Sequence, residues 1–164
     1  MTKIGLLSDT HSYLDEAVFK HFESCDEIWH AGDFGNKAVA DQLAAFKPLR
    51  GVYGNIDGHD IRAIYQEHLH FTCENVRVWM THIGGYPGKY NPKISSALRR
   101  NPPDLFIAGH SHILKVIYDQ KLSCLHLNPG AAGKEGWHKV RTLMRFSITD
   151  KKIHTLEIVE LGNR

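Results

Sequence analysis

Short apolar segments alternate with amphipathic ones over the first third of the chain, and this alternation constrains the fold most strongly. Residues 3–7, 27–30 and 49–53 are apolar runs of the length that forms buried strands. Apolar residues at helical spacing fill the two intervals, over about 14–22 and between 38 and 44. Alternation of strand and helix indicates a parallel sheet, so the chain is predicted to be an α/β protein.

The rest of the chain is predicted to contain more strands and one helix. Residues 68–72 and 76–81 form strands joined by a tight turn, 104–108 is another short strand, and 92–100 is a helix with Asn91 as its N-cap. The last third predicts antiparallel strands over 115–119, 122–127, 141–149 and 152–159, with a hairpin turn at Asp150-Lys151.

Length and composition favour one soluble domain. The 164 residues are 42% hydrophobic and 23% charged, which is typical of a single globular domain over residues 1–164. The net charge is +2 without a basic run, so nucleic-acid binding through charge is not indicated. No apolar run approaches the roughly 20 residues that cross a bilayer, and no signal peptide is evident. We therefore predict a cytoplasmic protein with no membrane partner and three buried cysteines, and a homo-oligomer stays open.

Residue types that bind metals follow the predicted strands. They are Asp9, His11, Asp33, Asn55, His82, His110 and His112. Because ligands gather at the carboxyl ends of strands in open α/β sheets, five chain segments are expected to bring these side chains to one edge. In an extended loop, residues two apart point the same way, which would aim Asp9 and His11 at one ion. Oxygen and nitrogen ligands without thiolates suit manganese, iron, zinc, nickel or cobalt.

The order of these residues resembles a known family. The matching motifs are Asp9-x-His11, Gly32-Asp33, Gly54-Asn55-x-Asp57, Thr81-His82, Gly109-His110-Ser-His112 and Asn128-Pro-Gly130. They occur in the order of the calcineurin-like metallophosphoesterases, and the short length is similar to their compact bacterial and archaeal phosphodiesterase branch. The resemblance implies a four-layer α/β/β/α sandwich of two mixed sheets flanked by helices.

The resemblance also implies a binuclear metal centre with two divalent ions, with manganese favoured and nickel, zinc, iron or cobalt as alternatives. One ion would be held by Asp9, His11, Asp33 and His112, and the other by Asp33, Asn55, His82 and His110. The implied reaction is hydrolysis of a small phosphate ester by in-line attack of a metal-bridging hydroxide. Asp33, Asn55 and His82 would act in catalysis through that hydroxide and by positioning the phosphate.

Two positions depart from the family pattern. Many members have histidine after the asparagine, where it can protonate the leaving group, but this chain has Ile56. The loss favours phosphodiesters, or an acid from elsewhere; for nearby His59 a surface role is favoured. After His82, a further ligand expected two residues later is replaced by Gly84, and the glycines there predict a flexible loop over the site. Its candidate substrate contacts are Tyr86, Lys89 and Tyr90, against the alternative of an ordinary surface loop.

The remaining polar residues are assigned structural roles. Asn36 is predicted to cap a helix and Asp57 to orient the Asn55 loop or cap the next helix. His30 and His126 are predicted to be packed inside, His21, His68, His70, His138 and His154 to lie on the surface, and Trp29, Trp79 and Trp137 to belong to the core or an interface.

Two classes of function fit the sequence. The leading one is a metal-dependent phosphodiesterase. The alternative is a catalytically weak scaffold of the same fold that acts by protein–protein binding, as a trafficking subunit of the eukaryotic retromer is thought to do. Because a scaffold can lose ligands at no cost, the seven filled ligand positions favour the enzyme.

Overall fold

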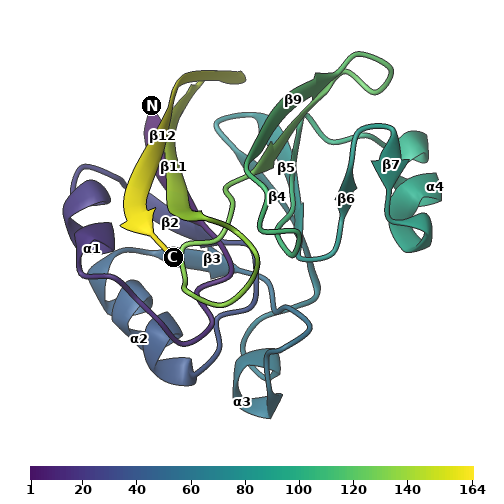
Figure 1. Cartoon of the computed structure of the whole chain (residues 1–164). Coiled ribbons are helices and arrows are strands. Elements are labelled where there is room, and N and C mark those ends of the chain that lie inside the picture. The colour runs from purple at the N-terminus through teal and green to yellow at the C-terminus, as the bar shows by residue number, and fades with distance from the viewer.

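Four helices and twelve strands build the chain (Figure 1). The structure is a computed structural model that describes residues 1–164. The helices are α1 (Ala17–His21), α2 (Lys37–Phe46), α3 (His59–Arg62) and α4 (Pro92–Arg100). The strands are β1 (Thr2–Leu7), β2 (Glu27–His30), β3 (Leu49–Gly51), β4 (His68–Cys73), β5 (Val76–Thr81), β6 (Gly85–Tyr86), β7 (Lys89–Tyr90), β8 (Leu105–Ile107), β9 (Lys115–Asp119), β10 (Cys124–Asn128), β11 (Val140–Thr149) and β12 (Lys152–Asn163).

The long strands form two five-stranded mixed sheets. The first has the order β12-β11-β1-β2-β3, and the second has the order β4-β5-β8-β10-β9. In the first sheet β1, β2 and β3 are parallel, while β11 runs antiparallel to both β1 and β12. In the second sheet β5, β8 and β10 are parallel and the edge strands β4 and β9 are antiparallel to their neighbours. The parallel arrangement predicted for the first third of the chain is confirmed.

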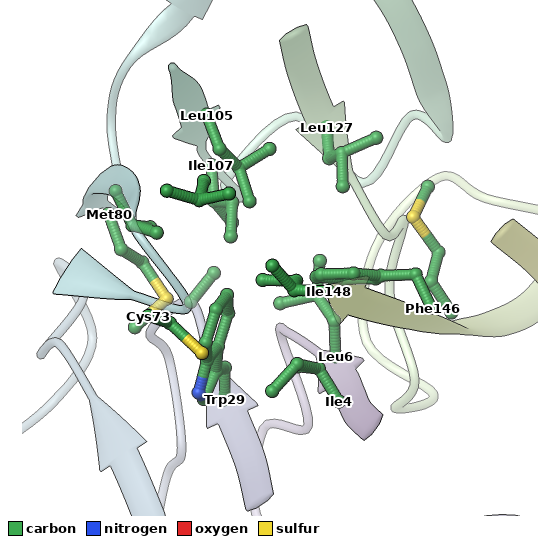
Figure 2. Close-up of a cluster of buried hydrophobic side chains, with 14 of the residues drawn as sticks. Ile4, Leu6, Trp29, Cys73, Met80, Leu105, Ile107, Leu127, Phe146 and Ile148 are labelled. Atoms are coloured by element: carbon green, nitrogen blue, oxygen red, sulfur yellow. The ribbon is translucent and has the colours of Figure 1, made fainter. Parts of the chain in front are cut away.

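The inner faces of the two sheets bury one apolar core between them (Figure 2). Leu6 of β1 and Trp29 of β2 come from the first sheet, and Met80 of β5 and Ile107 of β8 come from the second. All four side chains are fully buried. Burying each such side chain contributes roughly 1.5–3 kcal/mol, so this interface holds the sheets together.

The helices cover the outer faces. Val18 and Phe22 at α1 and Leu43 of α2 pack on the first sheet, while Ile94 and Leu98 of α4 pack on the second. The layers are therefore helix, sheet, sheet and helix, which confirms the four-layer α/β/β/α sandwich (Figure 1). None of the helices is long and apolar enough to cross a membrane. The three cysteines are buried and unpaired, as predicted.

Local signals set the element boundaries. Asn36 accepts a hydrogen bond from the backbone N–H of Val39 and caps α2, and Asn91 accepts one from Lys93 and caps α4, as predicted. The first helix begins at Ala17 rather than at residue 14, because the Asp15 carboxylate accepts the Ala17 backbone N–H.

The predicted flexible loop after His82 is instead a short hairpin. Gly85 pairs with Tyr90 between β6 and β7. The turn at Pro87-Gly88 has Gly88 at φ 89°, a left-handed conformation that suits glycine. The Tyr90 hydroxyl donates to Asp119 Oδ2 at 2.6 Å and ties the hairpin to the end of β9. The glycines that predicted flexibility instead allow the backbone of this tight turn.

Candidate metal centre

All seven predicted ligand residues follow the carboxyl ends of parallel strands. Asp9 and His11 follow β1, Asp33 follows β2, Asn55 follows β3, His82 follows β5, and His110 and His112 follow β8. Three of these strands belong to the first sheet and two to the second. The site therefore spans both sheets at one edge of the sandwich.

Asp9, His11 and His112 form a first group. One potential ligand atom from each lies within 4.8 Å of the others. Asp9 Oδ1 is 3.1 Å from Nε2 of His112 and 3.7 Å from Nε2 of His11. The Asp9 side chain is fully buried and both histidines are largely covered. We call Asp9, His11 and His112 the enclosed group.

Asp33, His82 and His110 form a second group of the same size. His82 Nε2 is 3.1 Å from Asp33 Oδ2. Asn55 joins this group, since its Oδ1 is 3.0 Å from Nδ1 of His110. His110 and Asn55 are exposed, in contrast to buried His82 and Asp33. We call these four residues the open group.

Asp33 stands between the two groups. Its Oδ2 is 3.3 Å from Nε2 of His11 in the enclosed group and 3.1 Å from Nε2 of His82 in the open group. Its other oxygen, Oδ1, accepts the backbone N–H of Ile56 at 3.0 Å, which fixes the carboxylate plane. The geometry therefore suits Asp33 as a bridge between two cations.

The backbone at the site is strained. Five of the seven residues have positive φ, namely Asp9 (54°), His11 (45°), Asp33 (59°), His110 (69°) and His112 (60°). The Asp9-x-His11 loop is therefore left-handed rather than extended, which corrects the prediction, although its side chains still converge. Backbone hydrogen bonds from Asp9 to Gly32 and from His11 to Asp33, both 3.0 Å, hold this conformation. Such strain costs about 1–3 kcal/mol per residue and typically clusters at functional sites.

Surrounding hydrogen bonds leave selected atoms unpaired. Ser8 Oγ and the His110 backbone N–H donate to Asp9 Oδ2, at 2.6 and 3.1 Å. His82 Nδ1 donates to the Ala31 carbonyl at 2.7 Å, so its Nε2 carries no proton in a neutral ring.

The buried atoms Asp9 Oδ1, His11 Nε2 and His82 Nε2 lack hydrogen-bond partners. Leaving such a buried group unpaired costs about 1–3 kcal/mol. Asp9 Oδ1 lies 3.7 Å from Nε2 of His11 and 3.7 Å from Nε2 of His82. The residues therefore fit divalent cations.

The electrostatics of the site favour ionised carboxylates. Burial alone would raise the pKa of Asp9, but the nearby rings of His11 and His112 hold that pKa well below its usual range. Burial likewise opposes ionisation of Asp33, and contacts with His11 and His82 lower its pKa strongly. The adjacent carboxylates of Asp33 and Asp9 raise the pKa of His11 to about 10. Two carboxylates thus stay charged in a buried setting, which attracts cations.

The structural roles predicted for nearby residues are confirmed. Asp57 is buried and accepts the backbone N–H groups of Phe34, Gly35 and Gly54 at 3.2, 2.9 and 2.8 Å, so it joins the Asp33 loop to the Asn55 loop. It does not cap α3, which has no side-chain cap. His30 is buried and stacks on Phe34 at 3.7 Å between ring centroids.

His138 is the residue that sequence reasoning missed. It was predicted to lie on the surface, but its Nδ1 lies 3.3 Å from Nδ1 of His112 and its Nε2 donates to the Gly133 carbonyl at 2.7 Å. Burial lowers the pKa of its imidazole. The neighbouring Trp137 is 99% exposed, so it is not a core residue.

The candidate substrate contacts line a cavity of about 350 Å³ beside the open group. Tyr86, Lys89 and Tyr90 lie on its wall together with His110. The Lys115 ammonium sits 4.4 Å from the centroid of the Tyr86 ring. The Tyr90 hydroxyl is engaged with Asp119, which leaves its ring as the available surface.

Comparison with known proteins identifies the family. Residues 2–151 match the model of the calcineurin-like phosphoesterase superfamily domain, so the chain belongs to that superfamily.

Named relatives agree with this membership, and a solved structure shares the fold. A protein of Methanothermobacter thermautotrophicus that carries the name "Probable metallophosphoesterase" is 32% identical over 135 residues, which cover 78% of this chain and 76% of that protein. A phosphodiesterase of Methanocaldococcus jannaschii is 25% identical over 145 residues, covering 78% of this chain and 82% of the relative. The crystal structure of Vps29 from Entamoeba histolytica in complex with zinc shares the fold, with a TM-score of 0.74, 16% identity and 98% coverage of both chains.

Proposed function

We propose that the protein is a phosphodiesterase that needs two divalent metal ions. The observation that carries this proposal is the pair of adjoining ligand groups, Asp9, His11 and His112 beside Asp33, His82 and His110. Family membership supports phosphoesterase chemistry. Manganese remains the favoured metal, with nickel, zinc, iron and cobalt as alternatives.

Each ligand group would hold one of the two ions. The enclosed group with Asp33 would hold one ion, and the open group would hold the other, with Asp33 shared. When bound, two such ions activate water for attack and offset charge that develops on phosphoryl oxygens. The exposed amide of Asn55 and the exposed ring of His110 would orient the phosphate, since both face solvent beside buried Asp33 and His82.

Two cavities beside the open group favour a diester over a monoester. The cavity with Tyr86 and His110 lies on one side. A second cavity, also of about 350 Å³, includes Asn55 and His82, and Ile83 borders both. A phosphodiester has two substituents, and this arrangement offers a separate space for each. Ile56, which is 45% exposed and carries no proton donor, favours leaving groups that need little protonation.

The scaffold reading is the second candidate. It has the support of the fold likeness to Vps29, which rests on 16% identity and therefore concerns the fold alone. All seven expected ligand positions carry a side chain that can bind a metal, so a scaffold would have kept these seven side chains and five strained backbone positions without using them.

A metal-supplemented hydrolysis panel tests the proposal. Purified protein would be assayed with aryl phosphomonoesters, aryl phosphodiesters and cyclic nucleotides in the presence of manganese. We expect the highest kcat/KM for a diester. Faster hydrolysis of monoesters would contradict the diester preference. The panel would be repeated with nickel, zinc, iron and cobalt, and no hydrolysis of any ester with any of the five metals would support the scaffold.

A further inference from the structure

Two histidine rings lie against each other behind the enclosed group. His138 Nδ1 is 3.3 Å from Nδ1 of His112, and the ring centroids are 5.1 Å apart at an interplanar angle of 73°. On its other side His138 Nε2 is 2.7 Å from the Gly133 carbonyl. His112 in turn points Nε2 at Asp9 Oδ1, at 3.1 Å.

The hydrogen bonds determine where the protons sit. A carbonyl oxygen only accepts, so the proton of His138 is on Nε2, and Nδ1 of the neutral ring is an acceptor. The contact between the rings then requires the proton of His112 to be on Nδ1. Nε2 of His112 is left with its lone pair directed toward Asp9. The opposite arrangement would put a proton of His112 on Nε2, where a cation should bind.

The loop that carries His138 is fixed to the loop that follows β1 and carries Asp9. The Gly133 backbone N–H donates to the Asp9 carbonyl at 3.0 Å, and the Ala132 N–H donates to Ser8 at 2.9 Å. Gly136 has φ 127°, and a Cβ at this position would collide with Nδ1 of His112. The loop therefore fits closely around the paired rings. Asp9 contacts Gly133, Gly133 contacts His138, His138 contacts His112, and His112 contacts Asp9 again.

We propose that His138 is a positioning residue that sets the tautomer and orientation of His112 for metal binding. The proposal rests on the proposed function, because it assumes that His112 is a metal ligand. Histidine ligands usually donate their second ring N–H to a carboxylate, a carbonyl or water. Here the acceptor is a second histidine, His138, whose own orientation is fixed by its hydrogen bond to the Gly133 carbonyl.

Two variants of similar shape separate hydrogen bonding from packing. His138→Asn keeps an acceptor near the position of Nδ1, whereas His138→Leu removes it. Zinc affinity would be measured by competition with a chelator for both variants and for the wild type. We expect His138→Leu to weaken one of the two zinc sites by about 10- to 100-fold and to leave the other unchanged. His138→Asn should recover most of the loss, and His154→Leu, at the opposite end of the first sheet, should bind as the wild type does.

Nitrogen-15 NMR of the zinc-loaded wild type tests the same claim without a variant. The expected spectrum has a protonated, slowly exchanging Nδ1 on His112 and zinc on Nε2. Three results would overturn the proposal for His138 alone. The first is zinc bound to Nδ1 of His112. The others are an equal loss of zinc affinity in His138→Leu and His138→Asn, or unchanged affinity at both zinc sites in His138→Leu. A wild type that binds no zinc would overturn the metal centre as well.

Discussion

The two ligand groups differ in how far they open to solvent. In the enclosed group the Asp9 side chain has no exposure and those of His11 and His112 have 17% and 14%. In the open group Asn55 and His110 are exposed and two cavities adjoin them. The difference suggests a division of roles, in which the enclosed group anchors an ion and the open group meets the substrate. Asp33 joins the two, and the following predictions test this division.

Removing the shared carboxylate charge should have the largest effect. Asp33→Asn keeps the size of the side chain but loses the oxygen that lies near both His11 and His82. We expect diester hydrolysis to fall by orders of magnitude and both metal sites to weaken. Steady-state kinetics and elemental analysis would measure this, with Asp41→Asn on the exposed face of α2 as the matched control. Turnover equal to the wild type would rule out the bridging role.

Changes confined to one group should separate anchoring from substrate handling. Asp9→Asn should lower metal content, because its charge is buried among His11 and His112. Asn55→Ala should leave the ion of the enclosed group and the thermal stability close to those of the wild type, while it weakens the ion of the open group and reduces turnover. Metal analysis, thermal unfolding and kinetics on both variants would decide. The division fails if Asn55→Ala empties the enclosed group while Asp9→Asn keeps its metal.

The metal-free protein should become less stable as the pH rises. Asp33 and Asp9 raise the pKa of His11 from 6.5 to about 10 in the folded state. A raised pKa means that the protonated ring stabilises the fold, fully below about pH 6.5 and progressively less up to about pH 10. Thermal unfolding of chelator-treated protein across this range would show it, and His11→Asn should flatten the slope. A midpoint independent of pH would contradict the ion pairing.

The smallest effect is expected outside both groups. His59 is exposed on α3, beyond the Asn55 loop. His59→Ala should leave the pH–rate profile of diester hydrolysis unchanged. Loss of one limb of that profile would instead identify His59 as the leaving-group acid that Ile56 does not supply.

Residues at strand ends were predictable because strand polarity and residue type both appear in the sequence. An apolar run followed by Asp, Asn or His places a ligand at a known edge of a parallel sheet, and all seven candidates converge there. The sequence could not predict how the loops bend, since the positive φ of Asp9 and His11 depends on hydrogen bonds to the neighbouring strand's loop.

Contacts between residues that a long loop brings together were not predictable from the sequence. His138 is 26 residues from His112, and only the path of the chain after β10 brings the rings together. Its neighbour Trp137 is exposed, so no apolar pattern marks this segment as buried. The hairpin at β6 and β7 was missed for a related reason, because Gly-Gly and Pro-Gly permit a mobile loop as readily as a closed turn.

Chelation followed by metal add-back tests the central claim most directly. Hydrolysis of an aryl phosphodiester would be measured before chelation, after it, and after manganese is restored, with metal content determined at each stage. We predict that chelation abolishes activity and that activity returns as the metal content reaches two ions per chain. Activity that is indifferent to the chelator, in protein that contains no metal, would contradict the two-metal account.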